Sequence, residues 1–371
     1  MKLSDKEIER YSRQIVLDEI GFEGQQKLKN SIVTVVGIGG LGSPITQQLV
    51  AMGIGRIRII DRDVVEISNL HRQVLYGDDD IGLSKAEAAY YRLKRINPQV
   101  NIEPLTLSIN DDTVDKVVTG SDVVVDGLDS VSARYTINRA CVRLKVPYIF
   151  GSAIVTTGSA TTIIPNKTAC LECFQPSLKD EEMPKCGTEG VHPSILTTIS
   201  SVQVSETIRI ITGKEPNLAN KLFLADIKKL DYDKITIIKQ NRCKVCGSNA
   251  DLSIKKTKRK LIENNVLDQA LNQAKNQINQ KFILVHGLNW HSGVLGIIAS
   301  RLVEKFNKPS IVISTDKTIS VGSARSIKQI NLGNIVLNAK KEGLLINGGG
   351  HRMAAGLKIN NNMINKFYDY F

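Results

Sequence analysis

Three glycines, Gly37, Gly39 and Gly42, follow a run of mostly β-branched residues and precede a helix-like segment in which Ser43 is the predicted N-cap. Glycine lets the backbone approach an anionic ligand closely, and the first N–H groups of a helix are free to bind that ligand. A second apolar run ends in Asp61, where a carboxylate can bind the hydroxyls of a ribose. These residues predict a nucleotide-binding domain, and they leave NAD, FAD and ATP open as ligands.

Further polar side chains suited to a phosphate ligand follow the second apolar run. Asn69, His71 and Arg72 lie in an irregular polar segment at a predicted strand end. Lys85 lies in the first turn of a predicted helix, where a cation opposes the helix dipole, so it either reaches an anion or is an exposed lysine. Asp129 follows another buried strand, and it either holds magnesium beside a triphosphate or caps the next helix.

Two CxxC pairs, separated by about 70 residues, offer four thiolates. Four cysteines in this pattern predict a closed, tetrahedral structural zinc site, and a disulfide is the weaker alternative in a reducing compartment. Cys186 stands apart in a loop beside Lys185, which either lowers its pKa and makes it reactive or leaves it inert. The predicted zinc ligands are Cys170, Cys173, Cys243 and Cys246.

The elements that must position these side chains alternate between strand and helix up to residue 151. Buried-strand patterns cover 31–36, 56–60, 122–126 and 147–151, and helical patterns cover 43–52, 82–95 and the segment from 131. This alternation predicts an α/β fold with a Rossmann-like, doubly wound and mostly parallel sheet. A shorter set of strands and helices beyond residue 260 predicts a second, small α/β domain.

Charge divides the chain near residue 250. Residues 1–250 carry 31 Lys and Arg against 30 Asp and Glu, whereas residues 251–371 carry 18 against 7. We therefore predict domains at 1–250 and 261–371 joined by a basic linker at 251–260. The basic C-terminal part indicates a polyanionic partner or a solubilising surface. No apolar run is long enough for a membrane span and the N-terminus is polar, so we expect a cytoplasmic protein with no membrane partner.

Several features follow one another along the chain: GxGGLG at 37–42, Asp61, SNLHRQ at 68–73, Lys85, D-G-x-D-S-x-x-x-R-Y at 126–135 and the two CxxC pairs. In this order they resemble the MoeB/ThiF/HesA adenylyltransferases. The resemblance covers about residues 4–248. It implies an ATP-dependent enzyme that activates the C-terminal glycine carboxylate of a ubiquitin-like sulfur carrier, of the MoaD or ThiS type, as an acyl-adenylate. It places that activity in molybdopterin or thiamin biosynthesis, and it implies a homodimer that uses magnesium as well as ATP.

The resemblance also implies roles for individual residues. Asp61 binds the ribose, Asp129 coordinates magnesium, and Arg13 reaches into the site of the partner subunit. Without that resemblance, Arg13 reads as part of a solvated helix face. Cys186 matches a mobile-loop cysteine that takes part in sulfur or thioester chemistry in some members and is dispensable in others. The remaining residues implied to surround the nucleotide or hold its phosphates are Gly37, Gly39, Gly40, Gly42, Asn69, Arg72 and Lys85.

The C-terminal part resembles a different family, the DHH-associated domain of RecJ-like exonucleases and phosphoesterases. The matching segments are NWHSGVLGIIASRL at 289–302, GSARS at 322–326 and GGGHRMAAGL at 348–357. The resemblance implies nucleic-acid or phosphate contacts at Arg325, Gly348, Gly349, Gly350 and His351. The metal-binding catalytic domain of that family is replaced here, so we expect no nuclease activity. An alternative to the enzyme is a nucleotide-binding scaffold whose C-terminal module binds nucleic acid. An equally weighted alternative for that module is a relic of gene fusion with little function.

Overall fold

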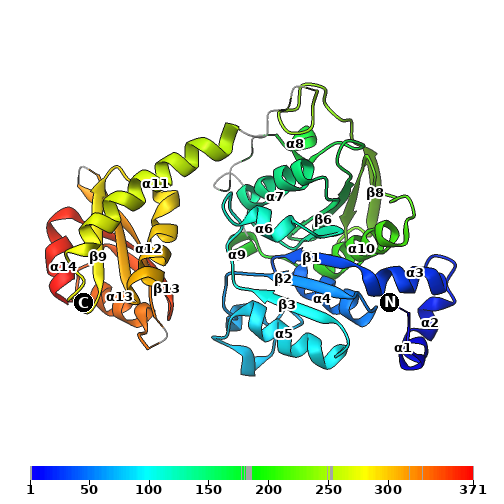
Figure 1. The fold of residues 1–371 in the computed structure, drawn as a ribbon, viewed down its shortest axis with the longest axis horizontal. Coiled ribbons are helices and arrows are strands. Elements are labelled where there is room, and N and C mark those ends of the chain that lie inside the picture. Colours follow the sequence, from blue (N-terminus) through cyan, green and yellow to red (C-terminus); the bar gives the residue numbers. More distant parts are fainter. Residues whose placement is uncertain are drawn as a thin grey trace. The chain divides into compact units, whose positions relative to one another are not determined.

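The computed structural model describes residues 2–370 apart from 177, 179, 181–185, 249, 251–253, 317 and 328 (Figure 1). The side chains of residues 186, 187, 254–264 and 351 also lie outside the described part. The chain forms two compact units, Met1–Leu252 and Ser253–Phe371. Among the described helices, none combines the length and the apolar character that a membrane span needs.

The first unit is built on an eight-stranded sheet in the order β3-β2-β1-β4-β5-β6-β7-β8. Neighbouring strands are parallel from β3 to β5 and antiparallel from β5 to β8. The predicted Rossmann-like, mostly parallel sheet is therefore confirmed. The strands are β1 (Ile32–Val36), β2 (Arg56–Ile60), β3 (Asn101–Leu105), β4 (Val123–Asp126), β5 (Tyr148–Ile154), β6 (Thr157–Ile163), β7 (Lys221–Asp226) and β8 (Asp231–Thr236).

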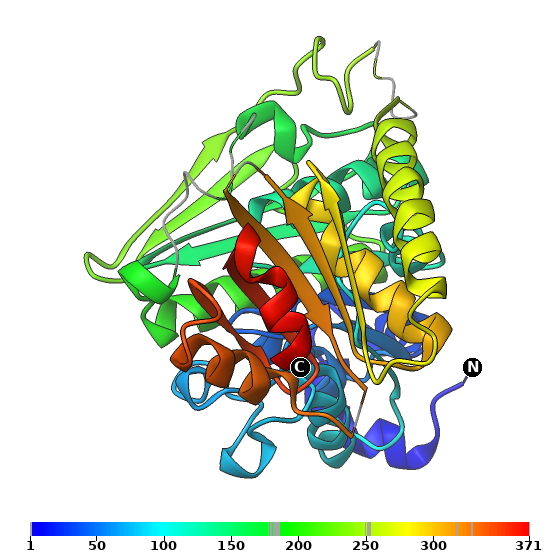
Figure 2. The same cartoon turned by 90° about the vertical axis from the view of Figure 1, so that its left-hand side faces the viewer.

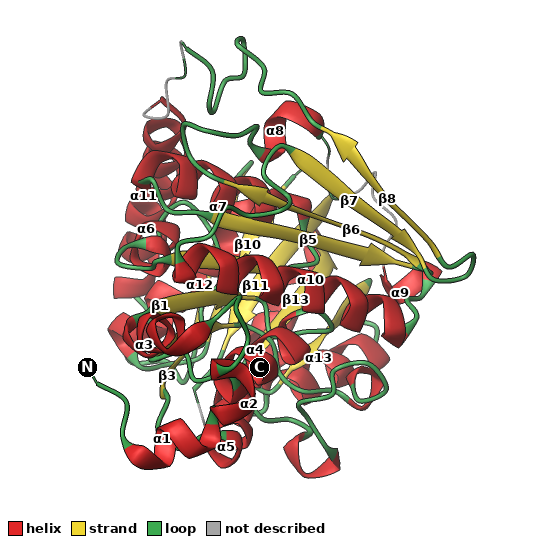
Figure 3. Cartoon of the chain, turned by 90° about the vertical axis from the view of Figure 1, so that its right-hand side faces the viewer, coloured by secondary structure: helices red, strands yellow, loops and turns green. Residues whose placement is uncertain are grey.

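Successive residues of the central strands enter two separate apolar clusters, because side chains along a strand point to alternate faces. In β4, Val123 and Val125 join one cluster and Val124 joins the other. The first cluster packs under α3, α4, α5 and α10, and Figure 3 shows α10 over the antiparallel part of the sheet. The second packs under α6, α7 and α8. The helices are α1 (Asp5–Arg10), α2 (Ser12–Ile15), α3 (Gly21–Asn30), α4 (Gly42–Ala51), α5 (Lys85–Ile96), α6 (Val114–Val118), α7 (Val131–Leu144), α8 (Leu171–Phe174), α9 (Cys186–Glu189) and α10 (Pro193–Thr212).

The second unit is a small α/β domain, as predicted. Its five-stranded sheet has the order β12-β13-β11-β10-β9, with only β9 and β10 parallel. One apolar cluster lies under α13 and α14 and another under α11 and α12 (Figure 2). The elements are α11 (Ile254–Lys275), β9 (Ile283–Leu288), α12 (Ser292–Phe306), β10 (Ser310–Thr315), β11 (Ile319–Arg325), α13 (Leu332–Lys341), β12 (Asn347–His351), β13 (Ala354–Asn360) and α14 (Ile364–Tyr370).

Backbone packing determines the shape of the glycine turn between β1 and α4. The N–H of Gly37 donates to the carbonyl of Ile60 at 2.7 Å, which ties the end of β1 to the end of β2. A methyl group on Gly42 would lie 1.8 Å from the carbonyl oxygen of Gly37, and one on Gly127 would lie 2.2 Å from it. Gly37 itself has a φ of +83°, which favours glycine. The turn therefore needs these glycines for its own packing, and Gly127, which lies in the motif at 126–135, is one of them.

The helix after this turn begins earlier than the sequence predicts, so Ser43 is not its N-cap. α4 starts at Gly42, with Leu41 in the N-cap position. The N–H of Ser43 already forms a helical bond to the carbonyl of Gly39 at 2.9 Å, and its hydroxyl donates to the carbonyl of Ile38 at 3.2 Å. The close approach of Gly42 to the end of β1 lets the first helical turn form within the glycine motif.

This packing predicts different consequences for two alanine substitutions in the same turn. Gly42→Ala places a methyl group against a backbone oxygen, so it should lower the free energy of unfolding of the first unit by roughly 3 kcal/mol. In Gly39→Ala the nearest atom to the new methyl group is Nε2 of Gln73 at 3.6 Å, an ordinary contact, so the change should stay within about 0.5 kcal/mol. Urea unfolding followed by far-ultraviolet circular dichroism measures both.

Trp290 provides an internal reference for that measurement. It is the only tryptophan of the chain and lies in the second unit, so its fluorescence transition should not move in either variant. Equal losses of stability in Gly42→Ala and Gly39→Ala would contradict the packing described here.

Candidate nucleotide site and cysteine cluster

The amino end of α4 offers unpaired backbone donors at the carboxyl edge of the parallel strands. The N–H groups of Gly39, Gly40 and Leu41 form no hydrogen bond with any residue that the structure describes. Gly39 faces open space apart from Gln73, whereas a methyl group on Gly40 would lie 2.7 Å from Leu196 of α10. The sheet order reverses between β1 and β4, which is where open α/β sheets bind ligands. Free N–H groups at a helix amino end suit a phosphate.

Asp61 is buried at the end of β2, and both of its carboxylate oxygens accept backbone hydrogen bonds. Oδ2 accepts from the N–H of Ile38 at 2.7 Å, and Oδ1 accepts from the N–H of Asp63 at 2.8 Å. Burial raises the pKa of Asp61, and the nearby Lys85 ammonium opposes that rise. Asp61 therefore anchors the glycine turn. Because each carboxylate oxygen has a second lone pair, a contact with a ribose stays a prediction.

Tyr76 links the glycine turn to α5. Its buried hydroxyl lies 2.9 Å from the carbonyl oxygen of Ile38 and 3.2 Å from that of Lys85, so its proton bridges the two elements. Burial raises the pKa of this tyrosine well above its usual range, which keeps the hydroxyl a donor. No local pattern marks Tyr76 as a site residue, because its role depends on contacts between segments that lie far apart in the chain.

Lys85 is buried as the first residue of α5, so the alternative of an exposed lysine is wrong. Its Nζ lies 3.6 Å from Oδ2 of Asp63, whose side chain is 55% exposed. A buried cation at the amino end of a helix is unfavourable unless an anion compensates it. One loose ion pair with the largely hydrated Asp63, and the charge of the nearby buried Asp61 beyond ion-pair distance, compensate it only in part. The position therefore suits a further anionic group.

The segment after β2 folds into a tight turn around Asn69. A 3-10 helix spans Ile67–Asn69, and the buried side-chain oxygen of Asn69 accepts from the N–H of Glu66 at 3.2 Å. One guanidinium nitrogen of Arg72 donates to the carbonyl of Ser68 at 2.5 Å, and its other N–H groups remain for a ligand. His71 is exposed in the same turn. The side chain of Asn69 therefore stabilises the turn, and the guanidinium group of Arg72 extends from it.

A buried ion pair fixes the loop that carries Asp129. Nε of Arg134 lies 3.1 Å from Oδ2 of the fully buried Asp126, and Nη2 of Arg134 donates to the carbonyl of Gly151 at 2.9 Å. Asp129 is exposed, and no residue in the described part of the chain bonds its carboxylate. Ser130, not Asp129, is the N-cap of α7, which excludes the capping alternative. An exposed carboxylate is thus presented at the carboxyl end of β4.

Arg13 lies at the other end of α4 from the glycine turn. Its neighbour Gln14 donates from Nε2 to the carbonyl of Met52, which is the C-cap of α4, at 2.8 Å. A ten-residue helix is about 15 Å long. Arg13 itself is exposed. The fold of a single chain therefore does not bring Arg13 to its own nucleotide site.

The four predicted zinc ligands cluster, with all of their Sγ atoms within 4.8 Å of one another. Cys170 and Cys243 are 3.6 Å apart and Cys173 and Cys246 are 3.3 Å apart, and all four cysteines are free, which argues against the disulfide alternative. Sulfurs about 2.3 Å from a tetrahedral zinc ion sit about 3.8 Å apart, so the set fits a metal.

Backbone and proton interactions of the cluster agree with that fit. The N–H groups of Gln240 and Val245 point at Sγ of Cys173 and Cys243, at 3.4 and 3.5 Å. Such donors orient thiolate ligands. Burial raises the pKa of Cys173 to about 11, whereas a hydrogen bond from Cys170 lowers that of Cys246 to about 5. A bound dication would replace the protons of these thiols.

Two other predicted sites are only partly described. Cys186 begins α9, but its side chain lies outside the described residues, so its chemistry stays a prediction. In the second unit, Arg325 of β11 and His351 of β12 both pair in register with Ala354 of β13. The sheet thus brings Arg325 and the Gly348–His351 strand to one end. The side chain of His351 is not described.

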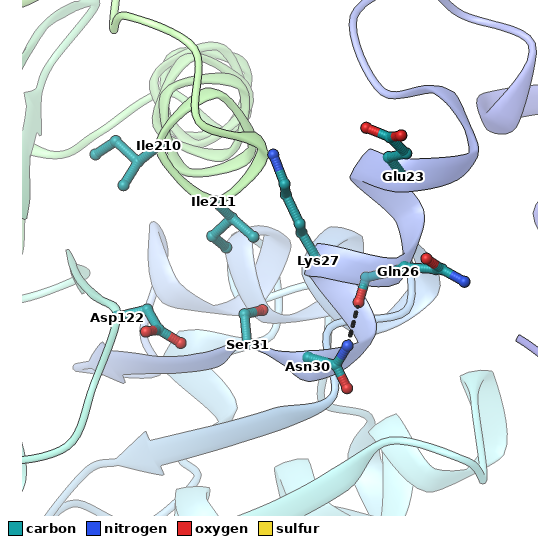
Figure 4. A pocket seen from close by; sticks show the side chains of 8 residues that line it. All are labelled: Glu23, Gln26, Lys27, Asn30, Ser31, Asp122, Ile210 and Ile211. Atoms are coloured by element: carbon teal, nitrogen blue, oxygen red, sulfur yellow. Dashed lines mark hydrogen bonds between the residues drawn. The ribbon is translucent and has the colours of Figure 1, made fainter. Parts of the chain in front are cut away.

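A separate open hollow of about 670 Å³ lies at the opposite, amino ends of β1 and β4 (Figure 4). Its Lys27 is already bonded to the carbonyl of Thr212 at 2.8 Å. No residue of the predicted nucleotide site reaches this hollow. The lining residues are Glu23, Gln26, Lys27, Asn30, Ser31, Asp122, Ile210 and Ile211.

Among curated proteins, the chain is 37% identical over 255 residues to the SAMP-activating enzyme E1 of Haloferax volcanii, which covers 68% of this chain and 94% of the relative. It is 36% identical to the sulfur carrier protein adenylyltransferase of Thermus thermophilus, over 67% of this chain and 93% of that protein. It is 41% identical to adenylyltransferase and sulfurtransferase MOCS3 of Aedes aegypti, but this match spans only 58% of that protein.

Solved structures agree with the sequence relatives. Escherichia coli MccB with ATP superposes with a TM-score of 0.57 at 27% identity, over 64% of this chain and 74% of that one. MccB with AMPCPP and MccA gives a TM-score of 0.58 at 28% identity, with the same coverage. The DHHA1 domain model matches residues 279–371, and the ThiF family model matches residues 11–246. Since that second match covers more than half of the chain, this protein belongs to the ThiF family.

Proposed function

We propose that the protein is an ATP-dependent adenylyltransferase that activates the C-terminal glycine carboxylate of a ubiquitin-like sulfur carrier of the MoaD or ThiS type. The observation that carries this proposal is the buried, under-compensated Lys85 beside the free N–H groups of the glycine turn. The names of the Haloferax and Thermus relatives point to the same substrate class.

The polar groups divide by chemistry around a bound nucleoside triphosphate. The glycine turn, Asn69, Arg72 and Lys85 would hold the phosphates, and the free lone pairs of Asp61 would accept from the ribose. Asp129, exposed at the end of β4, would bind magnesium, which neutralises charge on the leaving pyrophosphate. A hard cation of this kind prefers carboxylate oxygen.

The reaction needs positioned cations more than a base. A carboxylate is ionised at pH 7, so it attacks the α-phosphorus without losing a proton. The bond from that phosphorus to the oxygen that bridges the α- and β-phosphates breaks. Pyrophosphate departs with that oxygen, and the product on the carrier is an acyl-adenylate. Negative charge grows on the phosphate oxygens in the transition state, and Lys85 and Arg72 stabilise that state more than the ground state.

A homodimer would complete this set of cations. Arg13 is exposed and lies at the far end of α4, so a second chain could present its own Arg13 where this chain cannot. The proposal therefore includes an arginine supplied in trans, and the same logic makes an isolated chain a poor catalyst.

Carrier-dependent exchange of ³²P between pyrophosphate and ATP tests the adenylation step. Lys85→Ala and Asp129→Ala should each lower exchange by at least about 100-fold, because each removes charge that the transition state needs. Lys94→Ala, at the other end of the same helix, should keep near wild-type exchange. Near wild-type exchange in both Lys85→Ala and Asp129→Ala would contradict the proposed function. Supplying MoaD-type and ThiS-type carriers separately identifies the pathway.

We further propose that the cysteine cluster holds one structural zinc ion, which would join the α8 region to the end of the first unit. The purified protein should contain one zinc per chain, and Cys173→Ser should lose it and lower the thermal unfolding temperature. Cys141→Ala serves as the control, because Cys141 is buried in α7 and lies outside the cluster. Metal-free protein with unchanged stability in chelator would contradict this proposal.

For the second unit, the joint position of Arg325 and the Gly348–His351 strand favours a contact with nucleic-acid phosphates, in line with the excess of basic residues after residue 250. The full chain should bind a single-stranded oligonucleotide with an affinity that falls as salt rises. Arg325→Ala should weaken binding and reduce the salt slope by about 1, whereas Lys305→Ala, at the far end of α12, should change it less. No binding at low salt would favour the fusion-relic alternative.

A further inference from the structure

Gln73 is a buried amide that forms no side-chain hydrogen bond with any residue that the structure describes. Its side chain follows Arg72 in the turn around Asn69, and the residue is only 4% exposed. Its backbone N–H donates to the carbonyl of Asn69 at 2.9 Å, but its Oε1 is buried with no donor. Backbone hydrogen bonds thus hold the turn, and the side-chain amide of Gln73 takes no part in them.

The amide faces the glycine turn. A methyl group on Gly39 would lie 3.6 Å from Nε2 of Gln73, and no other atom lies within 4 Å of that position. Gly39 is also the first of the residues whose N–H groups are free at the amino end of α4. Gln73 therefore lines the same open space that a phosphate bound to those N–H groups would enter.

Two other buried amides have an unpaired atom, and the comparison separates Gln73 from them. Gln203 donates from Nε2 to the carbonyl of Asp126 at 2.8 Å, and Asn138 accepts at Oδ1 from the N–H of Leu171 at 3.1 Å. Each of those amides ties backbone segments together. Gln73 makes no such tie, so packing alone does not explain an amide where an apolar side chain of similar volume would avoid a cost of about 1–3 kcal/mol.

We propose that Gln73 is a binding residue for the polyphosphate of the nucleotide, with Nε2 donating to a phosphate oxygen seated on Gly39. This inference rests on the proposed function. The terminal torsion of a glutamine is soft, so the amide can turn its nitrogen toward the ligand at little cost. The contact adds a neutral, directional donor to the cations Arg72 and Lys85, and thereby places a phosphate oxygen rather than only attracting it.

Gln73→Met removes the amide while keeping the volume and the flexibility of the side chain. The dissociation constant of the full chain for AMPCPP with magnesium, measured by calorimetry without carrier, should rise about tenfold, as expected for one lost bond to a charged group. The urea midpoint without nucleotide should be unchanged or higher, because an unpaired buried group is gone. Gln73→Glu should weaken binding further than Gln73→Met, since it places a carboxylate beside the phosphates.

Gln25→Met is the matched control. Gln25 is as buried as Gln73, but its Nε2 donates to the carbonyl of Met52 at 3.0 Å, at the far end of α4. This variant should lose stability and keep the wild-type dissociation constant. If Gln73→Met instead loses stability and binds AMPCPP as the wild type does, Gln73 is structural and the inference is overturned.

The same data separate this inference from the proposed function. Wild-type binding of AMPCPP with no carrier-dependent exchange would reject the adenylation proposal while the effect of Gln73→Met still decides the role of Gln73. A wild-type chain that binds no AMPCPP would overturn both.

Discussion

The backbone of Ile38, at the centre of the glycine turn, is held at both its N–H and its carbonyl group. Its N–H is held by Asp61 at the end of β2, and its carbonyl accepts from Tyr76 and from Ser43. On either side of it, a methyl group on Gly42 would collide with the carbonyl of Gly37, and one on Gly37 would collide with the backbone of Gly127. These bonds set the position of α4 relative to β1 and, through Tyr76, of the first residue of α5. The free N–H groups and Lys85 keep their relative positions only while this turn is intact.

The same turn explains the arrangement of charge. A cation is buried at a helix amino end, and Asp63, with which it forms a loose ion pair, is largely hydrated. An approaching polyanion therefore meets positive groups that are already in place. Preorganised charge of this kind needs no rearrangement when negative charge develops in a transition state. The proposed adenylation chemistry uses this arrangement, and it requires only that the nucleophile arrive ionised. The second unit has its own sheet and its own apolar clusters.

Residue types and spacing were sufficient to predict the parallel sheet, the glycine turn and the cysteine cluster, because each has a local pattern. They failed where the deciding contact lies far away in the chain. Ser43 looks like a helix cap, but the approach of Gly42 to Gly37 starts the helix earlier. Asp61 could be predicted as a ligand-facing carboxylate, yet its bonds to Ile38 and Asp63 are visible only in the fold. Gly127 and Gln73 lie within the motifs at 126–135 and 68–73, but residue type alone does not show what they do. Their roles, like that of Tyr76, arise from packing against the glycine turn. For Lys85 the sequence left two alternatives open, and burial excludes the exposed one.

In the proposed reaction, the carboxylate of a carrier attacks the α-phosphate of ATP in this site. Intact-mass measurement of the carrier after incubation with the protein, ATP and magnesium tests it most directly, with a carrier that lacks its C-terminal glycine as the control. The account predicts that AMP becomes attached to the intact carrier, that the truncated carrier stays unmodified, and that pyrophosphate is released. Formation of ADP with an unmodified carrier would place the cleavage at the γ-phosphate and contradict the account.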